Sequence, residues 1–63
     1  MITWKKIGDL YYVYDDEYLF GWVQWDSIRL IYKFVLLSTS DYLDEKRSES
    51  VTNKLNELNK GNI

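Results

Sequence analysis

Residues 11–25, YYVYDDEYLFGWVQW, decide the fold, because they hold seven of the eleven aromatic side chains within fifteen positions. Aromatic and β-branched side chains suit a pleated surface. The acidic residues at 15–17 divide the stretch into two apolar runs, a pattern that is typical of a β-hairpin. We therefore expect strands at about 10–14 and 18–25, with Tyr12 opposite Phe20.

The polar pair Asp26-Ser27 predicts a second turn, and the apolar residues that follow predict a third strand at about 28–37. A two-residue turn would place Trp25 opposite Ile28. The residues before the hairpin end in the turn signal Gly8-Asp9 and are expected to form only a short edge segment, from which Trp4 folds back on the core. These segments predict a three-stranded antiparallel β-meander.

The polar C-terminal third predicts one amphipathic helix at about 48–60. Its apolar stripe has the spacing i, i+4 and i+7 and consists of Val51, Leu55 and Leu58. Ser48 suits the N-cap and Gly61 the C-terminal stop. The stripe does not continue backward through polar Arg47, so residues 41–46 are expected to form a loop or a short turn. One long helix from residue 41 is the alternative.

Length and composition predict a single small α+β domain, residues 1–63, whose core alone gives marginal stability. A single core in a chain below roughly 70 residues seldom contributes more than ~3–5 kcal/mol to the free energy of unfolding unless a disulfide, a metal or a second subunit adds to it. The chain has no cysteine and no histidine, which excludes disulfides and the commonest metal ligand. We expect no cofactor, no metal and no catalytic residues. Oligomerisation is the remaining way to stabilise the fold, and a homo-oligomer such as a homodimer is expected.

The charge distribution argues against phosphate-backbone binding as the main function. Net charge is −2, and residues 1–26 alone carry −3. Nucleic-acid-binding domains usually carry a basic patch. No basic-then-apolar leader and no apolar run of about 20 residues is present. These features predict a cytoplasmic protein without a membrane partner.

Alternation along the predicted strands divides the sheet into two faces. The helix is expected to cover the more aliphatic face, which collects Tyr11, Val13, Leu19, Val23, Trp25, Ile28, Leu30, Tyr32, Phe34 and Leu36. The other face would hold Leu10, Gln24, Ile31, Val35 and Leu37 together with the predicted partner-binding residues Tyr12, Tyr14, Tyr18, Phe20, Trp22, Arg29 and Lys33. An apolar patch of this size marks an interaction surface in most soluble proteins. A shifted register, coverage by Trp4 and residues 38–47, and burial in a homodimer are the alternatives.

The sequence therefore favours a small non-enzymatic protein-binding module. The chain lacks alanine and proline and is rich in lysine, asparagine, isoleucine and tyrosine, a composition typical of AT-rich genomes. Its size, acidity and composition resemble those of the accessory proteins that phages use against host enzymes, which suggests an inhibitor of a host protein. One alternative is single-stranded nucleic-acid binding on the aromatic face with Arg29 and Lys33. Another is an acidic nucleic-acid mimic. The acidic run 15–17 lacks the length and glycine of a calcium loop and is interpreted as a solvated hairpin tip.

Overall fold

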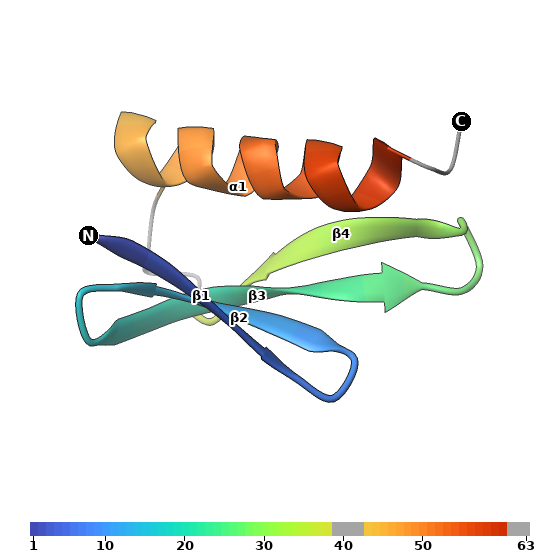
Figure 1. The fold of residues 1–63 in the computed structure, drawn as a ribbon, viewed down its shortest axis with the longest axis horizontal. Coiled ribbons are helices and arrows are strands. Elements are labelled where there is room, and N and C mark those ends of the chain that lie inside the picture. The colour runs from blue at the N-terminus through green and yellow to red at the C-terminus, as the bar shows by residue number, and fades with distance from the viewer. Residues whose placement is uncertain (39–42, 61–63) are drawn as a thin grey trace.

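The computed structural model describes residues 1–38 and 43–60, which form one antiparallel sheet with a helix packed across one of its faces (Figure 1). The strands follow one another in the order β1-β2-β3-β4. The elements are β1 (Ile2–Ile7), β2 (Leu10–Asp15), β3 (Tyr18–Asp26), β4 (Ile31–Leu36) and α1 (Glu45–Asn59). The expected α+β class, a meander followed by one C-terminal helix, is confirmed. We call the face of the sheet opposite α1 the open face.

The expected number of strands was wrong, because the N-terminal segment is a full strand. β1 pairs with β2 along its whole length, from Ile2 opposite Asp15 to Ile7 opposite Leu10. The Gly8-Asp9 turn joins the two strands, and Gly8 has a φ of 60°, a conformation that glycine adopts without strain. Trp4 packs on the core as expected. The polar residues between the apolar ones concealed the alternation of this strand.

The hairpin between β2 and β3 is present, but its register differs from the expected one. Tyr12 lies opposite Trp22, not opposite Phe20. The loop contains two residues, Asp16 and Glu17, and Asp16 has a φ of 56°. Aspartate tolerates this left-handed conformation better than most residues. The shorter loop shifts the pairing by one residue, and a bulge in β3 shifts it by one more before Tyr12.

A β-bulge in β3 reverses the side-chain alternation near this loop. Val13 lies opposite Gly21, but Tyr14 lies opposite Leu19, so Phe20 is an extra residue without a partner on β2. Such a residue bends the strand and redirects its side chain. Phe20 points toward the helix and is completely buried between Val13 and the helix. Residues 18–20, at the start of β3, consequently lie on the faces opposite to those that an unbroken strand would give them, whereas Trp22 and Val23 keep their expected faces.

The turn between β3 and β4 is longer than expected. Trp25 pairs with Tyr32 instead of Ile28, which leaves residues 27–30 as a four-residue turn. Because the register differs from the expected one by four residues, an even number, the remainder of β4 keeps its expected faces. Ile28 and Leu30, which were expected to pair within a strand, instead lie in the turn.

The helix starts three residues earlier than expected. Its N-cap is Asp44, not Ser48, and the Asp44 carboxylate accepts a hydrogen bond of 2.8 Å from the backbone nitrogen of Arg47. Residues 43 and 44 are not helical, which excludes one long helix from residue 41. Residues 41 and 42, part of the expected loop, and Gly61 lie outside the described residues.

The core lies between the bulge region of the sheet and the middle of α1. Val51 is buried and Leu55 packs against the same cluster, which confirms the helical stripe. Arg47 interrupts the stripe but still faces the sheet, because its Nε lies 3.0 Å from the carboxylate of Asp15. Four apolar side chains of the described residues are buried: Val13, Phe20, Val23 and Val51.

Candidate functional site

The open face carries rows of side chains that cross the four strands. One row runs from the β1 edge to the β4 edge through Lys5, Tyr12, Trp22 and Val35. The next row contains Thr3, Tyr14 and Leu19. Within the described part of the chain, no helix or further strand covers these rows (Figure 1). The rows are therefore a continuous surface built mainly from aromatic and aliphatic side chains.

Tyr12 and Trp22 hold each other in place at the centre of the open face. Their ring centroids are 6.5 Å apart and their planes are inclined by 52°. The Trp22 Nε1 donates a 2.9 Å hydrogen bond to Oε1 of Gln24, on the same face. The indole ring therefore has one defined orientation and its polar atom is already satisfied. A partner that covers it would meet an ordered apolar surface.

Lysines stand at both edges of the open face. Lys5 is exposed on β1, and Lys33 lies on β4 beside Gln24. The Lys33 Nζ is 3.8 Å from Asp26, the residue at the end of β3. The aromatic row consequently lies between two cationic edges, and a complementary surface would be apolar at its centre with acidic groups at its margin.

The structure brings four of the predicted partner-binding residues together on the open face: Tyr12, Tyr14, Trp22 and Lys33. It does not place the other three there. Tyr18 and Phe20 lie on the helix side, where the Arg47 guanidinium is 5.9 Å and 4.7 Å from their ring centroids. Their expected position was wrong because of the bulge. Leu19, expected beneath the helix, takes a place on the open face instead.

Arg29, the seventh predicted residue, lies in the β3–β4 turn, residues 27–30. Its guanidinium is exposed and 3.9 Å from the Asp26 carboxylate. Asp26 organises the whole turn. Its Oδ1 accepts hydrogen bonds from the backbone nitrogens of Ile28 at 3.0 Å and Arg29 at 3.1 Å, and its carbonyl accepts one from Leu30 at 2.7 Å. The backbone bonds from Arg29 and Ile28 lower the pKa of Asp26, and the nearby Lys33 and Arg29 charges act in the same direction.

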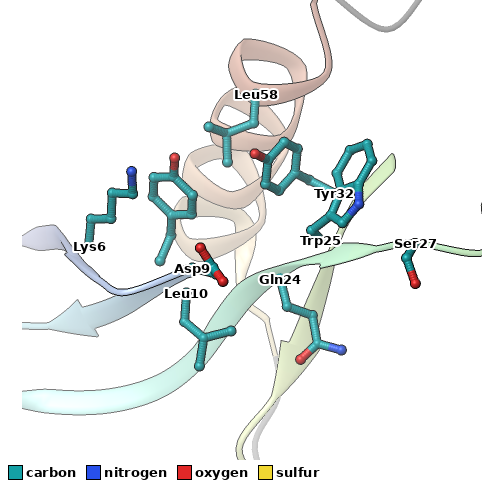
Figure 2. A pocket seen from close by; sticks show the side chains of 9 residues that line it. Lys6, Asp9, Leu10, Gln24, Trp25, Ser27, Tyr32 and Leu58 are labelled. Carbon is teal, nitrogen blue, oxygen red and sulfur yellow. The ribbon is translucent and has the colours of Figure 1, made fainter. Parts of the chain in front are cut away.

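A hollow of about 880 Å³ lies beside this turn, between the β1–β2 turn and the C-terminal end of α1 (Figure 2). Trp25 and Tyr32 form one wall, with ring centroids 5.1 Å apart, and Tyr32 meets Tyr11 edge to face at 6.0 Å. Lys6 and Asp9 lie at one end, whereas Ser27 lies at the other. The hollow exists because β3 extends beyond the start of β2. The last residues of β3 therefore have no neighbouring strand on the β2 side.

The acids of the front half are largely engaged within the chain. Asp15 lies 3.0 Å from the Arg47 Nε, and Asp16 lies 2.8 Å from the Met1 amino group. The hydrogen bond from Arg47 lowers the pKa of Asp15. The hydrogen bond to Asp16 raises the pKa of the Met1 amine. These ion pairs neutralise much of the acidic surface that a nucleic-acid mimic would need.

The sequence carries a signal for the β3 bulge and another for the β3–β4 turn. A glycine inside a strand suggests a bulge, and Gly21 occupies such a position. A Cβ at Gly21 would lie 2.5 Å from both the Phe34 ring and the Val35 carbonyl oxygen. Asp26 comes just before a turn, where an aspartate side chain commonly accepts hydrogen bonds from the backbone nitrogens that follow it. The position of Lys5 on the open face required strand β1, which was not predicted.

The chain matches no protein-family model, no curated protein and no solved structure. In the described part of the chain, no three acidic side chains come together where a metal ion could bind. The helix α1 is too short and too polar to cross a lipid bilayer.

Proposed function

We propose that the chain is a non-enzymatic binding module whose open face docks on another protein. The observation that carries this proposal is the row of Lys5, Tyr12, Trp22 and Val35, which crosses the sheet without a covering layer in the described residues. A sheet normally packs both faces against other layers or leaves a polar face to water. An aromatic face without a covering layer fits neither arrangement.

The composition of this face favours a protein as the partner. Tyrosine and tryptophan at the centre of an interface contribute most to binding energy, and an ordered ring loses little entropy on association. Tyr12 and Trp22 are ordered by their mutual contact and by Gln24. The lysines at the edges would orient an acidic-rimmed partner surface. A host protein bound by a phage-type accessory protein is one partner of this kind.

Two tyrosines provide a matched test, because they lie on opposite sides of the sheet. Tyr14 belongs to the open face, whereas Tyr18 is half exposed on the helix side. Protein captured from extracts of the source cell or its host should be purified and titrated against each variant. Trp22→Ala and Tyr14→Ala should weaken binding, with a loss above ~2 kcal/mol for Trp22 as at an interface hot spot. Tyr18→Ala should bind as the wild type does. Equal binding by all variants would contradict the proposal.

Single-stranded nucleic acid is the second candidate, and one observation favours it. Aromatic side chains on the central strands with lysines at the edges can stack bases and contact phosphates. Here Tyr12 and Trp22 supply the rings, and Lys5 and Lys33 the charges. Labelled oligonucleotides titrated at two salt concentrations separate the candidates. Binding that weakens with salt and disappears in Trp22→Ala would support nucleic acid and exclude a protein-only module.

A further inference from the structure

The β3–β4 turn presents apolar side chains to solvent. Ile28 is 92% exposed and Leu30 60% exposed, and Trp25 and Ile31 at the strand ends are each about 40% exposed. Isolated apolar residues on a surface need no explanation, but a contiguous group at a projecting turn marks an interaction site. This turn stands at the end of the sheet, beyond the β1–β2 turn (Figure 1).

The turn is already organised for burial. The backbone nitrogens of Ile28, Arg29 and Leu30 all donate to Asp26. Transfer of a polar group from water into an apolar site is costly mainly when it has no hydrogen-bond partner. Because these three donors keep their partners, the apolar tip can enter a hollow without leaving them unsatisfied.

Leu30 holds an unfavourable backbone conformation within this turn. Its φ is 59°, which places a branched side chain in the left-handed region. Residues held in such conformations concentrate at functional sites, where the surrounding structure imposes them. The Leu30 nitrogen is held within the turn by its bond to the Asp26 carbonyl.

The hollow beside the turn combines an apolar wall with polar margins. The rings of Trp25, Tyr32 and Tyr11 and the side chain of Leu58 form the apolar part, and Lys6, Asp9, Gln24 and Ser27 lie around it (Figure 2). Trp25 and Ser27 line the hollow and also adjoin the tip, so the projecting and the receiving parts belong to one patch. A two-fold dimer uses the same patch on both subunits and therefore requires such self-complementarity.

Charge adds a second complementarity within the patch. Asp9 is exposed at the edge of the hollow, and it makes no ion pair or hydrogen bond with any residue of the described ranges. Arg29 lies at the tip with most of its side chain in solvent. Lys6 also lines the hollow, but its ammonium group lies over the Tyr11 ring at 5.6 Å. A tip that enters the hollow of another copy would bring Arg29 toward Asp9.

From these observations we infer that two copies of the chain form a two-fold dimer in which each β3–β4 turn inserts into the partner's hollow. Ile28 and Leu30 fill the space beside Trp25 and Tyr32, and Arg29 pairs with the partner's Asp9. The hollow borders the open face at Gln24, but neither Tyr12 nor Trp22 lines it, so the dimer leaves both of these rings accessible. The inference does not depend on the proposed function.

Sedimentation velocity over micromolar to submillimolar concentrations tests the dimer. The wild type should show a concentration-dependent dimer, and Ile28→Asp should raise its dissociation constant about tenfold or more, as loss of a central interface side chain does. Thermal unfolding followed by circular dichroism should show that the variant remains folded, because Ile28 has no buried contact to lose. Trp22→Ala should dimerise as the wild type does.

A charge exchange identifies the pairing. Arg29→Asp and Asp9→Arg should each weaken the dimer, and the double variant should recover most of the wild-type dissociation constant. Glu49→Arg, an exposed charge on α1, serves as the control and should change nothing. Failure of the double variant to recover, while both single variants weaken the dimer, would overturn the Arg29–Asp9 pairing and with it this arrangement.

Three other results would also overturn the inference. The wild type could be monomeric throughout the concentration range. The dimer could persist in Ile28→Asp but disappear in Trp22→Ala, which would assign self-association to the open face. Monomeric protein could pellet with vesicles of mixed zwitterionic and anionic lipid while Ile28→Asp does not, which would make a bilayer surface the partner of the tip.

Discussion

The side-chain amide of Asn59 pairs with both backbone polar groups of Tyr32. Its Oδ1 accepts a 2.8 Å hydrogen bond from the Tyr32 nitrogen, and its Nδ2 donates a 3.2 Å bond to the Tyr32 carbonyl. Tyr32 belongs to β4, an edge strand of the sheet. Asn59 thus occupies backbone groups that a strand of another molecule could otherwise bind, and such edges promote aggregation.

Asn59→Ala should therefore destabilise the fold and expose the β4 edge. Two hydrogen bonds to part-buried backbone groups are lost, which should lower the free energy of unfolding by about 1–3 kcal/mol. Urea denaturation measures the loss, and light scattering at increasing concentration measures aggregation. Asn56→Ala, an exposed position one turn earlier on α1, is the control and should have little effect. Equal stability of the two variants would show that the Asn59 contact contributes nothing.

The ion pair between Asp15 and Arg47 should make stability fall in acid. The pKa of Asp15 lies below its ordinary value of 3.8 because Arg47 hydrogen-bonds to the carboxylate. The unfolded chain therefore takes up this proton at a higher pH than the folded one. The contribution is complete above about pH 5, and it is lost as the pH falls below the ordinary pKa and through the lowered pKa of the folded state.

Denaturant titrations between pH 7 and pH 2 can isolate this contribution. Asp15→Asn should be less stable than the wild type by a constant amount from pH 7 to about pH 5, and the difference should close in more acidic solution. Asp26 also has a lowered pKa, but it is present in both proteins and cancels from the comparison. If the difference stays the same down to pH 2, the Asp15 charge is not its source.

Residue types and alternation were enough to predict the class of fold and most of the two faces. The apolar stripe of α1 and the positions of Tyr12, Tyr14 and Trp22 followed from periodicity alone. Tyr18 and Phe20 could not be placed in this way, because one inserted residue in β3 reverses the alternation. Gly21 marks a candidate bulge in the sequence, but the close approach of the Phe34 ring and the Val35 carbonyl from β4 to this position involves another strand and cannot be read locally.

The helix start and the long turn were missed for another physical reason. Arg47 was interpreted as the end of the apolar stripe, yet Asp15, 32 residues earlier, makes its burial against the sheet favourable. Likewise Ile28 and Leu30 have strand-forming side chains, but three hydrogen bonds to Asp26 select a turn. Tertiary partners override the local propensity in both places.

Gly21→Ala tests the bulge directly. The new methyl group would lie 2.5 Å from the Phe34 ring and from the Val35 carbonyl oxygen, so the ring and the β4 backbone must both move. We expect a loss of about 1–3 kcal/mol in unfolding free energy, typical of overpacking in a core. Gly8→Ala is the control for added volume, because nothing lies within 4 Å of the position that a Cβ would occupy there.

The Gly8 control has its own cost, which can be predicted separately. Its φ of 60° places an alanine in the left-handed region, a strain of roughly 1–2 kcal/mol without any steric contact. The two variants therefore differ in where they act. Gly21→Ala should shift the amide resonances of β4, measured by NMR, whereas Gly8→Ala should change only those near the β1–β2 turn. Shifts confined to β3 in Gly21→Ala would contradict the predicted contact.

Leu30→Gly should raise stability and weaken self-association in the same protein. Glycine adopts the φ of 59° without the strain that leucine bears, and the relief should exceed the added freedom of the unfolded chain by up to about 1 kcal/mol. Leu30 is 60% exposed, so little buried contact is lost within one copy. In the inferred dimer, however, the same side chain enters the partner's hollow. Thermal unfolding at a concentration where both proteins are monomeric should show a higher midpoint for the variant, and sedimentation should show a weaker dimer. A variant that is more stable but dimerises normally would mean that the conformation of Leu30 serves the turn and not the interface.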